Sequence, residues 1–82
     1  MDKTVTATTL DLKGLKCPLP VLKTRKALTA LKAGDELVVL TTDPMAEIDI
    51  PHFCNENGHA LEAAERTEAG HAFRIRKGST AS

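Results

Sequence analysis

The spacing of hydrophobic positions changes along the chain, and each change predicts a secondary-structure element. Residues 5–12 are typical of a strand rich in β-branched threonine, which Gly14 ends. Residues 36–42, ELVVLTT, form an unbroken apolar run, which indicates a central strand covered on both faces. Residues 61–65 and 73–76 alternate hydrophobic residues with small or charged ones, so we expect two half-exposed strands joined by a turn.

The first segment with helical spacing follows the first strand and begins at Cys17 or Pro18. Its apolar face is formed by Val21, Thr24, Leu28 and Leu31. The sequence KAGDE ends this helix, with Gly34 in the position of a C-terminal glycine.

A second helical region follows the apolar run. Asp43 and Asp49 each stand just ahead of a proline and are expected to cap helix starts. This predicts a short turn after Asp43 and a main helix over about residues 50–57, closed by Gly58.

The order of elements, β-α-β-α-β-β, places the chain in the α/β (α+β) class. Right-handed crossovers would put both helices on one face of a four-stranded mixed sheet, which makes a two-layer sandwich. A length of 82 residues allows one domain, spanning residues 1–82. The last residues, 78–82, are expected to form a flexible tail.

Composition narrows the class of protein. Lys plus Arg number 11 and Asp plus Glu number 11, so the net charge is zero, and there are two Phe but no Trp or Tyr. Both the basic field and the stacking surfaces of a nucleic-acid-binding domain are therefore missing. The N-terminal residues are too polar for a signal peptide, and no segment approaches the roughly 20 apolar residues of a membrane span. We expect a cytoplasmic protein without membrane or direct nucleic-acid contact, in which Arg74, Arg76 and Lys77 form a solvated strand face.

The segment LKGLKCPLPVLKTRKAL, residues 12–28, contains the main candidate for chemistry. Pro18 and Pro20 fit the first turn of a helix, where no hydrogen bond is lost, and they stiffen the helix start. Cys17 then lies at the helix N-terminus, flanked by Lys13 and Lys16. Both features predict a pKa lowered from about 8.5 into the range of roughly 3.5 to 7.5. The alternative is that Cys17 is a small buried residue and the prolines only start a helix.

Cys54 and the histidines are weaker candidates. Two cysteines are too few for a disulfide framework, so Cys54 is interpreted as a packing residue, with a resolving partner for Cys17 as the alternative. The spacing of His52, Cys54 and His59 matches no zinc pattern. We therefore expect exposed histidines and neither a metal nor a cofactor.

Several motifs resemble one family. LDLKGLKCPLPVLKTRKAL, GDELVVLTTDP, DIPHFCNENGHAL and FRIRK together resemble the TusA/SirA family of small sulfur carrier proteins over nearly the whole chain. The resemblance implies the two-layer β-α-β-α-β-β fold and a Cys17 that accepts sulfane sulfur as a persulfide. It implies a cysteine desulfurase or a rhodanese as donor, and a downstream protein cysteine as acceptor. The destinations it implies include tRNA thiolation and sulfur oxidation.

Partner choice is expected to depend on the surface around Cys17. Carriers best known for tRNA thiolation have Glu between the two prolines, whereas this chain has Leu19, which puts the downstream partner in doubt. The predicted docking residues beside the thiol are Leu19, Lys23, Arg25 and Lys26. The basic residues among them, together with Lys13 and Lys16, form a positive patch suited to an acidic partner, with Leu19 as an apolar contact at its centre, although Arg25 could instead be an ordinary surface arginine. A thiol surrounded by a docking surface indicates a carrier rather than a free-standing multiple-turnover enzyme. A regulatory or interaction module and a redox-sensing thiol protein remain as alternatives.

Overall fold

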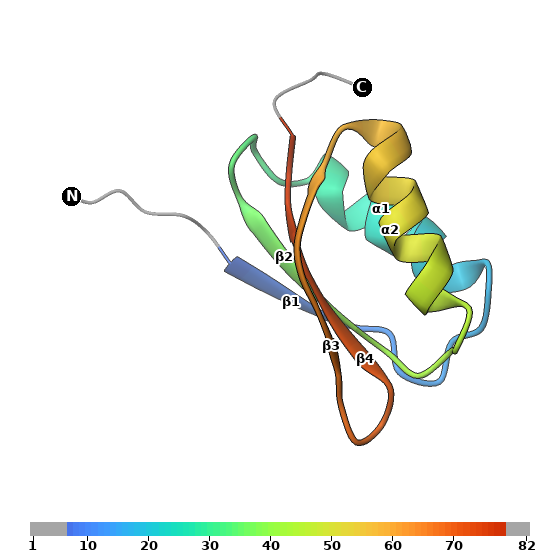
Figure 1. The fold of residues 1–82 in the computed structure, drawn as a ribbon. Coiled ribbons are helices and arrows are strands. Elements are labelled where there is room, and N and C mark those ends of the chain that lie inside the picture. Colours follow the sequence, from blue (N-terminus) through green and yellow to red (C-terminus); the bar gives the residue numbers. More distant parts are fainter. Residues whose placement is uncertain (1–6, 79–82) are drawn as a thin grey trace.

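The computed structural model describes residues 7–78, which form one sheet and two helices (Figure 1). The elements follow in the order β1 (Ala7–Asp11), α1 (Leu19–Thr29), β2 (Glu36–Thr41), α2 (Ala46–Asn57), β3 (Ala60–Arg66) and β4 (His71–Arg76). The predicted β-α-β-α-β-β order is therefore confirmed. The expected tail lies outside the described residues except for Gly78.

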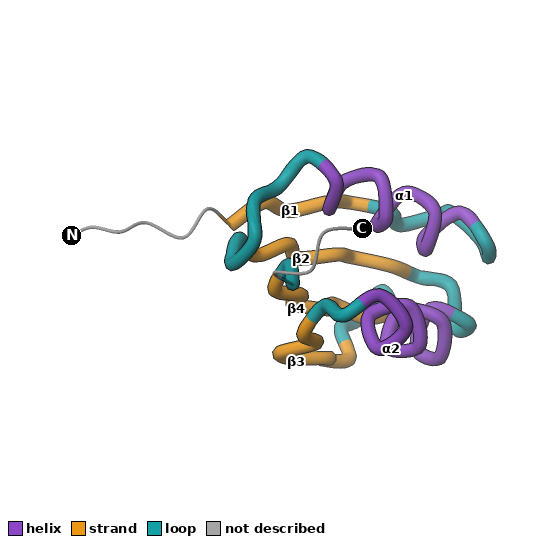
Figure 2. The backbone as a smooth tube through the Cα atoms, turned by 90° about the horizontal axis from the view of Figure 1, so that it is seen from above, coloured by secondary structure: helices purple, strands orange, loops and turns teal. Residues whose placement is uncertain are grey.

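The sheet has the strand order β1-β2-β4-β3. β1 pairs with β2 in parallel, and β4 runs antiparallel to both β2 and β3. Both helices lie on one side of this sheet, with α1 toward β2 and α2 toward β3 and β4 (Figures 1 and 2). The predicted mixed sheet with two helices on one face is confirmed.

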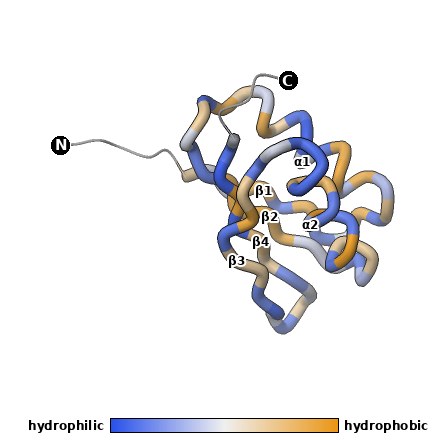
Figure 3. Tube along the Cα trace, turned by 45° about the horizontal axis from the view of Figure 1, so that its top comes forward, coloured by the Kyte–Doolittle hydropathy of each residue, from blue (hydrophilic) through white to orange (hydrophobic). Residues whose placement is uncertain are grey.

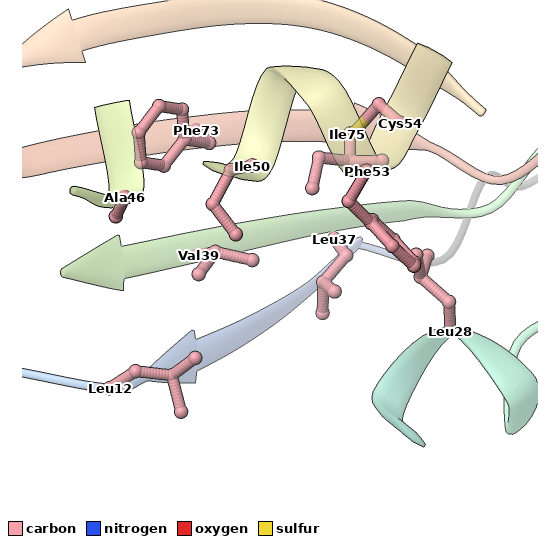
Figure 4. Close-up of a cluster of buried hydrophobic side chains, with 10 residues drawn as sticks. All are labelled: Leu12, Leu28, Leu37, Val39, Ala46, Ile50, Phe53, Cys54, Phe73 and Ile75. Atoms are coloured by element: carbon pink, nitrogen blue, oxygen red, sulfur yellow. The ribbon is translucent and has the colours of Figure 1, made fainter. Parts of the chain in front are cut away.

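The core lies between the two layers. Its buried hydrophobic residues are Leu12, Leu28, Leu37, Val39, Ala46, Ile50, Phe53, Cys54, Phe73 and Ile75. Figure 4 shows the Phe53 ring of α2 extending toward Leu28 of α1, so the helices also pack against each other. Burial of these side chains, at about 25 cal/mol per Å² of apolar area, is the main force that holds the layers together.

The expectation that β2 is covered on both faces is wrong. Leu37, Val39 and Thr41 are buried, but Glu36, Val38 and Leu40 between them are only partly buried. The helices cover one side of the sheet, so this central strand alternates even though its sequence is apolar on both sides. Elsewhere along the chain, hydrophobic and hydrophilic positions follow each other at short intervals (Figure 3).

The open face of the sheet carries paired charges, as expected for a solvated strand face. Arg76 donates from Nε to Glu62 Oε2 at 2.6 Å and approaches Glu36 at 3.3 Å, while Arg74 pairs with Glu36. The hydrogen bond from Arg76 holds the pKa of Glu62 below its usual value. Lys77 donates instead to the Leu31 carbonyl at 2.7 Å. These arginines are thus matched by carboxylates of the same face.

The bounds of α1 differ from the prediction at its C-terminal end. The helix ends at Thr29, where the Ala30 N–H donates to the Ala27 carbonyl and the Leu31 N–H donates to the Leu28 carbonyl, each at 3.1 Å. Gly34 lies further on, in the turn before β2, with φ of 93°. Its positive φ serves that turn, so its expected role as the helix C-terminal glycine is wrong.

The start of α2 also differs from the prediction. The helix begins at Ala46 rather than near Ile50, and it includes Pro51 in its interior. The Ala46 N–H donates to the Asp43 carbonyl at 3.0 Å, so the turn after Asp43 leads directly into the helix. Asp49 is therefore a residue of the first helical turn and not a cap. Gly58 closes α2 with φ of 74°, as predicted.

Within the part of the chain that is described, no helix combines the length and apolar character needed to cross a membrane.

Candidate functional site

Cys17 lies in the loop between β1 and α1 and is exposed. Pro18 stands at the N-cap position of α1, and Pro20 is buried in the first turn. The Leu19 N–H donates to the Lys16 carbonyl at 2.8 Å, which tightens the loop just before the helix. The prolines thus occupy the helix start as predicted, and they place the sulfur at the surface instead of in the core.

Two residues that follow β2 hold this loop in place. Asp43 accepts the Cys17 N–H on Oδ2 at 2.6 Å and the Met45 N–H on Oδ1 at 3.2 Å. Thr42 accepts the Gly14 N–H on Oγ1 at 2.9 Å. Because β1 and β2 are parallel, their carboxyl ends meet at the same edge, which brings the two loops together. Asp43 therefore links the backbone of the thiol loop to the start of α2.

Asp49 contacts the sulfur itself. The Cys17 thiol donates to Asp49 Oδ2, with 3.0 Å between sulfur and oxygen. This hydrogen bond raises the pKa of the Cys17 thiol, with smaller contributions from partial loss of water and from the negative charges of Asp49 and Asp43. The prediction of a lowered pKa is wrong for the free protein, because carboxylates, rather than Lys13 and Lys16, are the charges that act on the sulfur.

An open pocket lies beside the sulfur, between the start of α1 and one face of α2. Its volume is about 360 Å³. The lining residues are Cys17, Pro18, Val21, Asp49, His52, Phe53, Glu56 and Asn57. The α2 wall carries two carboxylates, those of Asp49 and Glu56, and this helix contains neither Lys nor Arg. A group that enters this pocket reaches the thiol and an acidic helix surface together.

The predicted basic site residues lie on the thiol loop and on α1, and Arg25 among them lines a groove between the two helices together with Phe53 and Asn57. Lys16, Lys23, Arg25 and Lys26 are exposed and make no ion pair with another described residue. Lys13 lies 3.9 Å from Asp11. Two leucines of the same surface are also exposed, Leu19 by 41% and Leu22 by 50%. The thiol therefore stands at a boundary between a basic, partly apolar α1 surface and the acidic α2 wall.

Sequence reasoning missed the carboxylates as partners of the thiol. Asp43 and Asp49 are 26 and 32 residues from Cys17, and each has an ordinary interpretation as a helix cap. A usable signal existed in Asp43, since it directly follows the apolar run over residues 36–42, and parallel strands joined by a helical crossover end at the same edge of a sheet. Asp49 had no such signal, because its role depends on which face of α2 turns toward α1.

Cys54 is buried in the core with 1% of its surface exposed, which confirms its interpretation as a packing residue. Burial raises the pKa of its thiol to about 11. Such a thiol is protonated at neutral pH and is a poor nucleophile. These properties disfavour Cys54 as a resolving partner for Cys17.

We predict that Cys54 makes the protein less stable in alkaline solution. The unfolded chain releases this proton near pH 9, whereas the folded chain holds it up to about 11, so the free energy of unfolding falls between these values. Over that window, the stability advantage of the wild type over Cys54→Ala should shrink by about 2 to 3 kcal/mol. Urea denaturation of both proteins at several pH values measures this difference in the free energy of unfolding. An advantage that stays constant with pH contradicts the prediction.

The two histidines near Cys54 differ in how exposed they are. His52 is exposed, as expected, but His59 is half-buried, and its Nδ1 accepts the Gly78 N–H at 2.9 Å. Burial, together with the charge of Lys77, lowers the pKa of His59. Among residues 7–78, no three His, Cys, Asp or Glu side chains are grouped so that they could hold a metal ion.

Fold and site together define a class of protein: a small α+β domain that presents one thiol at its surface, at the start of a proline-stiffened helix. Comparisons with known proteins place the chain within this class. The family described as "Sulfurtransferase TusA" matches residues 8–77. Because this match spans most of the chain, the protein belongs to the TusA family.

Individual relatives agree with that assignment. Two proteins from Neisseria meningitidis, of serogroups A and B, are each 51% identical over 59 residues, which covers 71% of this chain and 80% of theirs. Both are named "Putative sulfur carrier protein". The crystal structure of a SirA-like protein from Desulfitobacterium hafniense is similar with a TM-score of 0.76 and 27% identity, covering 87% of this chain and 97% of that one. Family and relatives support a role as a sulfur carrier.

Proposed function

We propose that this protein accepts sulfane sulfur on Cys17 as a persulfide and passes it to a cysteine of a partner protein. The observation that carries the proposal is the exposed Cys17 thiol at the rigid start of α1, in a chain of the TusA family. The second cysteine, Cys54, is buried, so Cys17 is the thiol that a partner can reach.

The transfer is an exchange between sulfur atoms. Cys17 loses its proton, and its sulfur attacks the outer sulfur of a persulfide on the donor. A new sulfur–sulfur bond forms on Cys17, the bond in the donor breaks, and the inner sulfur of the donor leaves as a thiolate. A thiolate of the acceptor then attacks the outer sulfur of the Cys17 persulfide in the same way. Oxidation states balance, so the relay needs no external oxidant.

The proposed donor is a cysteine desulfurase or a rhodanese, and the proposed acceptor is a downstream protein cysteine in the cytoplasm. tRNA thiolation and sulfur oxidation are the pathways to which such a relay would lead. Leu19 lies beside the thiol on the surface that a partner covers and is 41% exposed. An apolar side chain at that position suits an acceptor with an apolar contact at the centre of its own docking surface.

The direct test is to incubate the protein with a cysteine desulfurase and cysteine and to measure its intact mass. We expect a gain of one sulfur atom that dithiothreitol removes. The loaded protein, once purified, should then lose that sulfur to an acceptor cysteine. A mass that never changes under conditions where the desulfurase itself is loaded contradicts the proposed function.

Docking should depend on charge at the α1 surface. We predict that Lys16→Glu slows association with an acidic partner more than it speeds dissociation, and that Leu19→Glu weakens binding by adding a like charge at the centre of the contact. Wild-type association should also slow at high salt, since the Debye length is only about 8 Å at physiological ionic strength. Association and dissociation rates at low and high salt measure both effects.

Lys32→Glu is the matched control, because Lys32 is exposed but lies beyond the C-terminal end of α1, at the far end from Cys17. It makes the same charge change and should alter association only weakly. Rates that are independent of salt and equal in all variants would show that partners approach Cys17 from another side.

A further inference from the structure

The two aspartates beside Cys17, Asp43 and Asp49, bind different groups. Asp43 uses both oxygens on backbone N–H groups, at 2.6 and 3.2 Å, and so has a structural role. Asp49, in contrast, accepts no hydrogen bond from the backbone of the thiol loop as the structure describes it. Among the residues that the structure describes, its carboxylate has one hydrogen-bond partner, the Cys17 thiol at 3.0 Å.

A carboxylate can accept a hydrogen bond from this sulfur only while the sulfur holds its proton. Removing the proton would leave two negative charges in contact, and the second carboxylate, that of Asp43, stands close by on the Cys17 backbone. The same contact therefore stabilises the unreactive form of the thiol and opposes the reactive one. This is the reverse of what a helix N-terminus with flanking lysines would do alone.

The surroundings of Asp49 indicate what could relieve this repulsion. The charged and titratable groups around the thiol and this pocket are Asp43 ahead of α2, Asp49, His52 and Glu56 on α2, Lys13 and Lys16 on the thiol loop, and Arg25 of α1, which lines the adjoining groove. The α2 side of the pocket therefore has two carboxylates and no fixed positive charge. Its volume of about 360 Å³ is open to solvent beside the sulfur, so a side chain of a partner can enter it.

We propose that Asp49 is a catalytic residue that holds the Cys17 thiol protonated in the free protein, and that a lysine or arginine of the sulfur donor releases the thiol by binding Asp49 in this pocket. The second half of this inference rests on the proposed function, and the first half does not. When the cation pairs with Asp49, the thiol loses its acceptor and its proton passes to water. The thiolate then attacks the outer sulfur of the donor persulfide, and the inner sulfur leaves as described above.

This arrangement confines reactivity to the docked complex. A free carrier with a protonated thiol reacts slowly with small electrophiles and oxidants, whereas a docked carrier transfers sulfur. It also refines the chemistry of the partner. The basic α1 surface favours carboxylates on most of the partner's contact surface, and the α2 wall favours one cation close to the partner's own cysteine.

The test compares Asp49→Asn with the wild type in two measurements. The first is the rate of alkylation of Cys17 in the free protein by iodoacetamide, a neutral probe, over a range of pH. We expect alkylation near neutral pH to become about tenfold faster in Asp49→Asn, with the inflection of the pH profile shifted down. Glu56→Gln is the matched control, since Glu56 lines the same pocket without bonding the sulfur, and its rate should stay close to that of the wild type.

The second measurement is sulfur transfer from a loaded cysteine desulfurase at varied donor concentration. Asp49→Asn should raise the KM for the donor severalfold, since the partner cation has lost its carboxylate, while small-molecule alkylation becomes faster. A purely structural role for Asp49 would not make alkylation faster and at the same time weaken the use of the donor. If alkylation is no faster than in the wild type, Asp49 does not hold the thiol protonated. If alkylation is faster but the KM is unchanged, the donor does not bind Asp49 through a cation.

Cys54 reports on folding in the same mass spectra. It is buried in the native protein and should remain unmodified while Cys17 reacts. If Cys54 becomes reactive in Asp49→Asn, Asp49→Ser replaces it in both measurements. The alkylation result needs no sulfur donor, so it can succeed even where the proposed sulfur transfer fails, and the two failures are distinguishable.

Discussion

Cys17→Ser is expected to abolish sulfur loading from a cysteine desulfurase, with no mass gain above background. A serine hydroxyl cannot form a persulfide, and the buried Cys54 has a pKa of about 11 and is inaccessible to a partner's cysteine. The fold should be unaffected, because Cys17 is exposed and contributes nothing to the core. Intact-mass measurement after incubation with the desulfurase and cysteine determines the result.

Cys54→Ala is the complementary variant and should load one sulfur as the wild type does. Alanine is preferred to serine at this position, since serine would bury a hydroxyl among apolar side chains. A mass gain in Cys17→Ser that is lost when Cys54 is also replaced would assign the carrier thiol to Cys54 and contradict the site proposed above.

The second large effect is on stability. Leu37→Ala should lower the free energy of unfolding by about 3 to 5 kcal/mol, because it leaves a cavity in a side-chain position with 0% exposure on the central strand β2. A domain of this size has a total stability of only about 4 to 12 kcal/mol, so the variant should be close to unfolding. Urea denaturation followed by circular dichroism measures the change.

Leu22→Ala is the matched control for this substitution. Leu22 is 50% exposed on α1, and alanine favours helix, so the same change should cost less than about 1 kcal/mol. Equal losses at the two positions would contradict the placement of the core between the helices and one face of the sheet.

The pattern of hydrophobic positions was sufficient to predict the order of elements and the two-layer arrangement. Strand β4 alternates buried Phe73 and Ile75 with exposed Arg74 and Arg76, and this alternation is visible in the sequence. Prediction failed for β2, because an apolar run is equally compatible with burial on one face and on two. It also failed at the start of α2, where Asp49 and Pro51 look like a helix start although the helix already began at Ala46.

The candidate site was also predicted only in part. The sequence by itself was sufficient to place Cys17 at the surface beside a helix start, because Cys17, Pro18 and Pro20 are neighbours in the chain and their effect on the helix start is local. It could not determine the charge around that sulfur. Only the tertiary structure decided that Asp49, 32 residues away, accepts the thiol proton, since this depends on how two helices pack on a sheet. Electrostatic effects on a pKa act through space and not along the chain, so a motif can place a thiol at the surface without showing its protonation state.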